Sequence, residues 1–258
     1  MKAGNLFTVA IPRPKAPFRL FCFPHAGGGP VAFFNWAERL GPEIECVCVQ
    51  YPARGHRLRD QPLTRIDDLA REVEDGLSAA PQRPYAFYGH SLGGVVAFEL
   101  ARRLRQAGKR DLLHLFIGAA RPPHLESPLP PIHGLPQEAF IQTVQARYGG
   151  IPEIIYQDPE LLEMFLPGLL ADFTAFETYQ FQPDAPLNVP ITAFGGDQDT
   201  VVTPDSLKEW ALHTDAGFDM NVLPGGHFFP PTSVAELVRL LQTRMAAELR
   251  DGKSRRIG

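Results

Sequence analysis

One serine stands in a setting that could make it a nucleophile. Ser91 is the centre of the pentapeptide GHSLG at 89–93, a G-x-S-x-G pattern. The apolar run Tyr85–Tyr88 before it predicts a strand, and Val95–Gln106 after it has the periodicity of a helix. A serine at such a sharp strand-to-helix turn exposes its hydroxyl at a helix N-terminus, where backbone N–H groups favour developing negative charge. The sequence therefore predicts a nucleophilic serine.

A serine hydroxyl is a weak nucleophile and needs a base that is itself oriented by an acid. After a turn of this kind, the acid and then the histidine follow the serine along the chain. His227 lies in a glycine-rich loop after the last predicted strand, whereas His213 lies in a predicted helix. The loop after the preceding strand carries Asp197 and Asp199. We predict His227 as the base and Asp199 as the acid, because apolar residues follow Asp199 and anchor it inward. Asp197 is the alternative acid, and its other possible role is to stabilise the loop.

A tetrahedral intermediate also needs two preorganised N–H donors for its oxyanion. Leu92, the residue after the nucleophile, is predicted to supply one. The second is predicted to be the N–H of Ala26, in the stretch FPHAGGG at 23–29 that follows an early predicted strand. Glycines there let the backbone approach a substrate closely. No G-K-[ST] sequence accompanies them, which disfavours a phosphate site. His25 is expected to brace this loop rather than to act as a base.

Short apolar runs alternate with helical patterns along most of the chain. Strands are predicted at Leu20–Phe23, Cys46–Val49, Tyr85–Tyr88, Leu115–Gly118, Ile191–Phe194 and Met220–Leu223, and helices at Val31–Leu40, Ile66–Ala79, Val95–Gln106, Pro204–His213 and Val234–Leu249. Gly108 is expected to end the third helix, and Ser233 with Glu236 to form a capping box at the start of the last. This alternation predicts an α/β fold: a mostly parallel sheet with helices on both faces, in one domain over residues 1–258.

Residues 122–186 break the alternation. The segment is rich in proline and aromatic residues and has helical patterns at Gln137–Arg147 and Pro159–Tyr179, the second interrupted at Pro167-Gly168. Active sites of open α/β sheets lie at the C-terminal ends of the strands, and this segment leaves from one of them. We interpret it as a helical lid subdomain inserted in the main domain. An ordinary helical layer packed on the core is the alternative.

Composition excludes several function classes. With 25 Lys and Arg against 29 Asp and Glu, a net charge of −4 gives no electrostatic reason to bind nucleic acid. No apolar run approaches the ~18 residues of a membrane span. Residues 1–15 lack the apolar core of a signal peptide, so a cytoplasmic protein is expected. The tail 250–258 is expected to be frayed.

Cysteine usage indicates neither a disulfide framework nor a metal site. Cys22, Cys46 and Cys48 cannot all pair, and no further Cys or His follows at ligand spacing. Cys46 and Cys48 share one face of a predicted strand, which favours plain core residues. No metal or other cofactor is expected.

Five motifs, in this order, resemble the type II thioesterases of polyketide and nonribosomal peptide synthesis, a family of α/β-hydrolases. They are FPHAGG at 23–28, YPARG at 51–55, GHSLGG at 89–94, GDQD at 196–199 and GGHFF at 225–229. The resemblance spans roughly residues 18–245, and 172–179 is similar to the family's lid-helix signature. It implies an α/β-hydrolase fold with a triad of Ser91, Asp199 and His227 and an oxyanion hole at Ala26 and Leu92.

Members of that family are freestanding editing enzymes. They hydrolyse stalled or wrong acyl groups from the phosphopantetheine arm of acyl or peptidyl carrier proteins, through an acyl-enzyme. The resemblance implies the same function here, by an enzyme expected to be a monomer. A carboxylesterase or lipase of the same fold is one alternative. A hydrolase-fold binding protein without catalysis is another, and the complete Ser-Asp-His set argues against it.

The chain departs from the family pattern at two positions. Ala53 stands where the family usually has a glycine that tightens a turn, and Leu170 where an arginine usually precedes the lid aspartate. A basic cluster, formed by Arg54, His56, Arg57 and Arg59, follows the second predicted strand. It is either a landing site for an acidic carrier protein or a solvated loop.

Overall fold

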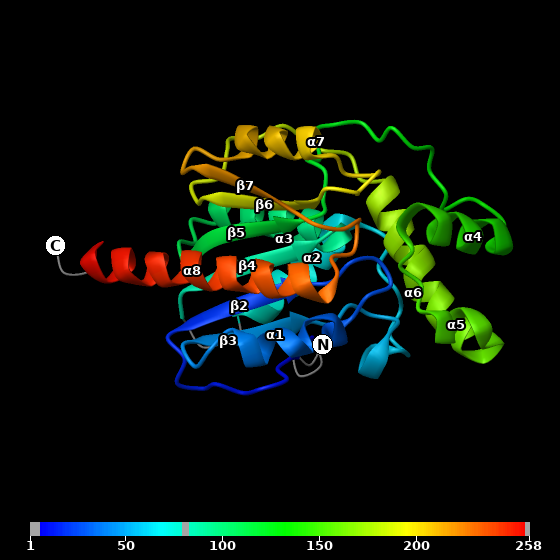
Figure 1. Cartoon of the computed structure of the whole chain (residues 1–258), viewed down its shortest axis with the longest axis horizontal. Coiled ribbons are helices and arrows are strands. Elements are labelled where there is room, and N and C mark those ends of the chain that lie inside the picture. Colours follow the sequence, from blue (N-terminus) through cyan, green and yellow to red (C-terminus); the bar gives the residue numbers. More distant parts are fainter. Residues whose placement is uncertain (1–5, 79–82, 256–258) are drawn as a thin grey trace.

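A computed structural model describes residues 6–78 and 83–255 of the chain, the side chains from residue 249 onward excepted. Within these residues the strands form one sheet, in the order β1-β3-β2-β4-β5-β6-β7 (Figure 1). The strands are β1 Phe7–Thr8, β2 Phe18–Phe23, β3 Ile44–Val49, β4 Tyr85–His90, β5 Leu112–Gly118, β6 Ile191–Gly196 and β7 Phe218–Leu223. All neighbours pair in parallel except β1, which pairs antiparallel with β3. The predicted α/β fold is confirmed.

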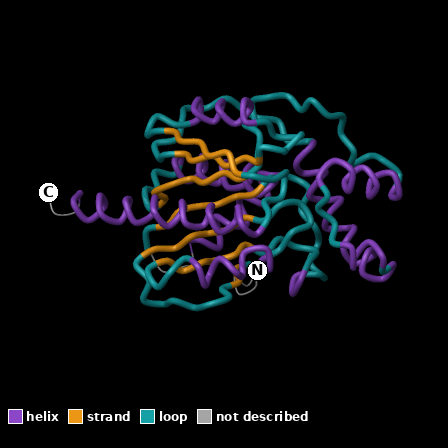
Figure 2. Tube along the Cα trace, in the orientation of Figure 1, coloured by secondary structure: helices purple, strands orange, loops and turns teal. Residues whose placement is uncertain are grey.

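Helices cover both faces of this sheet, which explains why its central strands are continuous apolar runs. Alternate side chains of β2 enter opposite cores: Phe21 and Phe23 pack with α2 (Ile66–Ser78) and α3 (Leu92–Gln106). Leu20 and Cys22 pack instead with α1 (Phe34–Arg39) and α8 (Pro231–Arg255), which lie in front of the sheet in Figures 1 and 2. The sheet is therefore the middle layer of three.

The cysteines lie in the core shared with α1 and α8. Cys22, Cys46 and Cys48 are all buried and unpaired, with Sγ–Sγ distances of 3.7 and 3.9 Å between neighbours. Cys46 and Cys48 share one face of β3, as predicted. In the described part of the chain, no helix combines the length and the apolarity that a membrane crossing requires.

Between β5 and β6 the chain leaves the sheet at the C-terminal ends of the strands. It forms α4 (Gln137–Tyr148), α5 (Glu153–Gln157) and α6 (Pro159–Glu177), seen in green and yellow-green at the right of Figure 1. The Asp158 carboxylate caps α6 by accepting from the N–H groups of Glu160 and Leu161. Phe140, Ile141, Val144, Leu169 and Phe173 are among the residues of a small core within this insertion.

Several local predictions need correction. The capping box at Ser233 is wrong: α8 begins at Pro231, and the Ser233 hydroxyl donates to the Pro224 carbonyl at 2.6 Å. The break at Pro167 is also wrong, because α6 continues through it. Residues 250–255 of the expected frayed tail belong to α8, and residues 256–258 lie outside the described residues. β1 and α5 were not predicted.

The remaining helices begin and end near their predicted limits. The predicted stretches Val31–Leu40 and Pro204–His213 each divide in two: a 3-10 turn at Pro30–Phe33 with α1, and α7 (Pro204–Lys208) with a 3-10 turn at Glu209–His213. A further 3-10 turn occupies Gly55–Arg57. The predicted end of α2 at Ala79 lies outside the described residues. Gly108, with φ +70°, follows the end of α3 as predicted, and the Lys109 N–H donates to the Leu104 carbonyl in a Schellman motif.

Candidate active site

The turn between β4 and α3 is as tight as its glycines allow. A Cβ on Gly89 would lie 2.2 Å from the Gly93 carbonyl oxygen, and a Cβ on Gly93 would lie 2.2 Å from the Phe23 carbonyl oxygen. Ser91 itself has φ 53° and ψ −120°, a backbone conformation that residues other than glycine rarely adopt. The surrounding structure holds this strain, and it presents Oγ at the N-terminus of α3.

Three residues from separate loops meet at this turn. His227 Nε2 lies 3.0 Å from Ser91 Oγ, and His227 Nδ1 lies 2.9 Å from Asp199 Oδ2. A carboxylate can only accept, so Nδ1 carries the proton and donates it to Asp199. Nε2 is then the unprotonated nitrogen, and it accepts a hydrogen bond from the Ser91 hydroxyl. The imidazole is oriented to remove the serine proton.

Of the two candidate acids, Asp199 contacts His227. Burial alone would raise the pKa of Asp199, but the hydrogen bond and charge of His227 and the N–H groups of Val202 and Val201 hold this pKa below its usual value. The carboxylate is therefore ionised. Asp197 has a different role: its Oδ1 accepts from the Gly225 N–H at 2.8 Å and so fixes the loop that carries His227.

His90 fixes the same loop from the other side, a contact that the sequence analysis missed. Its Nε2 lies 2.9 Å from the His227 carbonyl oxygen, so this nitrogen carries a proton and donates it. Its Nδ1 lies 3.2 Å from the Tyr88 hydroxyl, which donates in turn. Burial first, and the neighbouring His227 and His25 next, lower the pKa of His90 well below its usual value, which keeps the ring neutral. The variable position of the G-x-S-x-G pattern gave no signal of this role.

Ser91 and His227 open into a narrow, largely apolar cavity of about 30 Å³ beneath the insertion. Ala26 and Leu92 line the same cavity, so the two predicted N–H donors, one on the loop after β2 and one at the start of α3, lie beside the serine. The other lining residues are His25, Val144, Tyr148, Gly150, Ile151, Leu169, Phe173, Phe176 and Phe228. The Tyr148 ring lies over His227, with centroids 5.1 Å apart. The apolar character of this lining is suited to an apolar chain attached to a carbonyl group.

His25 lies within residues 23–29, the loop that carries Ala26 (the donor loop), as predicted. It forms no hydrogen bond with Ser91 or with the His227 side chain. Its ring packs edge-on against Phe228, with centroids 4.7 Å apart, and a Cβ on Gly28 would lie 2.9 Å from the ring. Burial, with the nearby His227 and Arg54 adding to it, lowers the pKa of His25 to about 4. A neutral ring wedged into the loop is a brace.

The basic cluster is mostly internal, so both interpretations, a landing site and a solvated loop, are wrong for its two buried arginines. Arg54 forms a two-pronged ion pair with Asp172 of α6, at 2.6 and 2.8 Å. Arg57 pairs with Glu72 and Asp60, at 2.6 and 2.7 Å, and its side chain is 8% exposed. Neither arginine is available to a partner. Of the cluster, His56 and Arg59 are exposed.

The sequence analysis also missed the Arg54–Asp172 pair. Asp172 lies on the apolar face of α6 between Leu169 and Phe173, and a lone acid on such a face is the signal that could have found it. Ala53, next to Arg54, has φ +60°, so the residue stands in the left-handed conformation that a glycine would adopt more easily.

Comparison with known proteins agrees with this geometry. The thioesterase domain model matches residues 18–245. The gramicidin S biosynthesis protein GrsT of Aneurinibacillus migulanus is 39% identical over 226 residues, 88% of each chain. The thioesterase RedJ of the prodiginine pathway in Streptomyces coelicolor has 37% identity and a TM-score of 0.83, covering 90% of this chain and 87% of its own.

A third similar protein is YbtT, a type II thioesterase of the yersiniabactin NRPS/PKS pathway. It has 28% identity and a TM-score of 0.83, over 94% of this chain and 99% of its own. The fold is thus similar to that of thioesterase structures along nearly the whole chain. The chain belongs to the thioesterase family, among the type II thioesterases, and is a thioester hydrolase of the α/β-hydrolase fold.

Proposed function

We propose that Ser91, His227 and Asp199 are the catalytic triad of this thioesterase, and that the N–H groups of Ala26 and Leu92 form its oxyanion hole. The observation that carries the proposal is the hydrogen-bonded series from Asp199 through His227 to Ser91, with distances of 2.9 and 3.0 Å. Series of this kind activate a serine hydroxyl by general-base catalysis.

The reaction proceeds in two halves. Ser91 Oγ attacks the thioester carbonyl carbon and transfers its proton to His227 Nε2, while Asp199 stabilises the imidazolium that forms. The carbonyl oxygen becomes an oxyanion that accepts from the two backbone N–H groups. The intermediate then breaks its C–S bond, and His227 returns the proton to the departing thiolate. An acyl ester on Ser91 remains.

Water completes the cycle. His227 removes a proton from a water molecule, whose oxygen attacks the acyl carbon, and a second oxyanion forms in the same hole. Its collapse breaks the ester C–O bond, His227 returns the proton to Ser91 Oγ, and the carboxylic acid is released. The apolar residues of the cavity accommodate the acyl chain, and Tyr148 and Phe173 of the insertion contribute aromatic side chains to this lining.

We propose that the acyl groups are delivered on the phosphopantetheine arm of acyl or peptidyl carrier proteins, and that the enzyme edits polyketide or nonribosomal peptide assembly. Similarity to thioesterases of such pathways supports this substrate class.

We further propose that residues 122–186 are a lid over the serine, because they supply most of the cavity lining. We also propose a monomer, located in the cytoplasm, which an editing enzyme must share with its carriers.

The test compares one acyl chain on three supports: a carrier protein, free pantetheine and an oxygen ester. We expect kcat/KM to be highest for the carrier-bound thioester and lowest for the oxygen ester. Ser91→Ala should abolish all three activities and labelling by a fluorophosphonate, with an unchanged circular dichroism spectrum. Substantial residual turnover in Ser91→Ala would refute the triad, and a preference for the oxygen ester would refute the substrate class.

A further inference from the structure

A buried carboxylate of α6 contacts the backbone of the loop to which we assign an oxyanion donor. Asp172 is 1% exposed, and its Oδ2 accepts from the Gly27 N–H at 2.7 Å. The same oxygen accepts from Arg54 Nη1 at 2.6 Å, and Oδ1 accepts from Arg54 Nη2 at 2.8 Å. The lid helix and the donor loop therefore share one hydrogen-bonded centre.

The Asp172 contact defines the direction of the peptide next to the proposed donor. Gly27 N belongs to the peptide group that follows Ala26, and Asp172 holds its N–H toward α6. The Gly28 N–H closes a turn on the His25 carbonyl at 2.9 Å. With these two neighbours fixed, the Ala26 residue has little freedom to rotate, and its own N–H keeps one orientation relative to Ser91.

Arg54 reinforces this arrangement through the acceptors of the same loop. Its Nη1 also donates to the Gly28 carbonyl at 3.1 Å, and its Nη2 lies 3.4 Å from the Gly168 carbonyl of α6. Its Nε donates to the Pro52 carbonyl at 3.1 Å. One guanidinium thus joins the sheet-side turn, the donor loop and the lid helix.

The packing leaves no space between loop and helix. Gly27 has φ +74°, and a Cβ there would lie 2.6 Å from Phe165 Cζ and 2.8 Å from Leu169 Cδ1, both side chains of α6. On the helix side, a Cβ on Gly168 would lie 2.9 Å from the Ala53 carbonyl oxygen. The contact between Asp172 and Gly27 therefore exists only while α6 is seated on the body, the part of the domain outside residues 122–186.

We propose that Asp172 is a positioning residue that makes a competent oxyanion hole depend on the seating of the lid helix. When α6 lies in place, its carboxylate aligns the Ala26 N–H; when α6 lifts, Gly27 loses its acceptor and the loop loses its alignment. Hydrolysis is thereby confined to the state in which the acyl chain is covered. This inference rests on the proposed function, in which Ala26 contributes to the oxyanion hole.

Asp172→Ala is the test, with a trifluoromethyl ketone bearing the preferred acyl chain as probe. The probe forms a tetrahedral adduct with Ser91, so its inhibition constant reports the oxyanion hole. We expect the inhibition constant to rise and kcat to fall together by about 10²-fold, the loss typical of one oxyanion donor, with KM changed less than about threefold. A rise in KM alone, or an unchanged inhibition constant, would overturn the proposal.

Glu177→Gln is the matched control on the same helix. The Glu177 carboxylate accepts from the Ile132 and His133 N–H groups at 2.8 Å, which lie within the insertion and away from the donor loop. We expect its inhibition constant to stay within about twofold of the parent value. Equal effects of both substitutions would show that lid stability, rather than alignment of the loop, is responsible.

Asp172→Ala leaves Arg54 buried without its partner, which can prevent folding. The double variant Asp172→Leu with Arg54→Met removes both charges and the Gly27 acceptor, and its melting temperature should remain near that of the parent. It must show the same rise in inhibition constant. If Ser91→Ala retains activity, the proposed function fails. If Ser91→Ala is inactive but the Asp172 variants bind the ketone with the parent's affinity, this inference alone fails.

Discussion

Three imidazole rings lie in a row beside the cavity, and burial keeps two of them neutral near pH 7. The ring centroids of His25 and His90 are 5.9 Å apart, and those of His90 and His227 are 5.7 Å apart. Burial lowers the pKa of His25 and of His90, whereas His227 has the Asp199 carboxylate as a partner. In the proposed mechanism, a proton taken from Ser91 therefore stays on His227, where the carboxylate stabilises it.

The two aspartates of the β6 loop permit a matched comparison at this scale. In Asp199→Asn the amide oxygen is taken by the Val201 and Val202 N–H groups, so the NH2 group faces His227 Nδ1 and favours the wrong tautomer. The value of kcat should fall by roughly 10³–10⁴-fold. Asp197→Asn keeps an amide oxygen that can accept from Gly225, so kcat should fall by less than about tenfold. Steady-state kinetics on one acyl-pantetheine thioester would measure both. The reverse ranking would identify Asp197 as the catalytic acid.

Buried histidines also make stability depend on pH. Burial is the main cause that lowers the pKa of both His25 and His213 to about 4; His227 and Arg54 add to it at His25, and His124 and Arg102 at His213. In the unfolded chain these histidines bind protons near pH 6.5. Their effect on the free energy of unfolding should therefore be absent above that pH, and this free energy should decrease as the pH falls from 6.5 toward 4. For His25 the slope approaches about 1.4 kcal/mol per pH unit.

Urea denaturation at several pH values between about 7 and about 4.5 would measure this decrease. His213→Gln removes one titrating ring, so its stability should change less over the same range. A free energy of unfolding that stays constant down to pH 4.5 would contradict the expectation.

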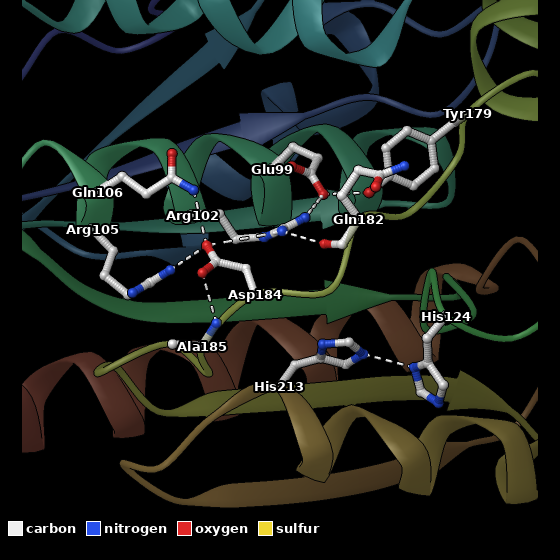
Figure 3. A network of polar contacts seen from close by, with 10 residues as sticks. All are labelled: Glu99, Arg102, Arg105, Gln106, His124, Tyr179, Gln182, Asp184, Ala185 and His213. Carbon is white, nitrogen blue, oxygen red and sulfur yellow. Dashed lines mark hydrogen bonds and ion pairs between the residues drawn. The ribbon is translucent and has the colours of Figure 1, made fainter.

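At the scale of elements, both connections of the insertion are held to the body (Figure 3). In the returning connection, the Gln182 carbonyl accepts from Arg102 of α3 at 2.5 Å, and Tyr179 donates to Glu99 of the same helix. In the outgoing connection, His124 and His213 share a hydrogen bond of 2.8 Å. Motion of the lid would therefore occur in α4, α5 and α6 rather than at the connections.

The size of the cavity beside Ser91 can be altered by a substitution in α4 without disturbing the body. Val144 of α4 lines the cavity, so Val144→Phe should lower kcat/KM for long acyl chains by about tenfold or more and leave short chains nearly unaffected. Ala175 of α6 is fully buried in the core beside α3, so Ala175→Val is the control. It should lower the melting temperature and leave the chain-length profile unchanged. An equal loss for all acyl lengths in Val144→Phe would contradict a role in this cavity.

The strands, most helices and the turn at Ser91 could be predicted from the sequence, but the partners of charged residues could not. Strands buried on both faces are apolar runs, and the glycines around Ser91 define the turn, so both were predictable. Arg54 and Asp172 are 118 positions apart, and no local pattern shows that they meet. Pro167 gave a local signal for a break, yet packing of Leu169 and Phe173 and the ion pair of Asp172 hold α6 continuous across it.

At the scale of the whole molecule, stability is unequally distributed. Two extensive cores flank the sheet, whereas the insertion has only a small core of its own. Local opening is easier where fewer apolar groups are buried. The lid should therefore open without unfolding of the body.

Native-state hydrogen exchange would measure this difference. We expect the slowest exchange in β2, β4, β5 and α3, and exchange in α4 and α5 faster by roughly 10²-fold or more. The boundary should fall within α6, whose second half packs on the body through Asp172 and Ala175. Uniform protection across all these elements would instead indicate that lid and body open only together.

The thiols of β2 and β3 have a practical consequence for observing the lid. Cys22, Cys46 and Cys48 are the only cysteines of the chain, and each is at most 1% exposed. A maleimide dye cannot reach them in the folded enzyme, so a cysteine introduced at an exposed position would be labelled alone. Ile154 of α5 is 69% exposed and Val222 of β7 is 43% exposed. A donor–acceptor dye pair at these two sites, in an otherwise native sequence, would report the distance between lid and body while acyl groups are turned over.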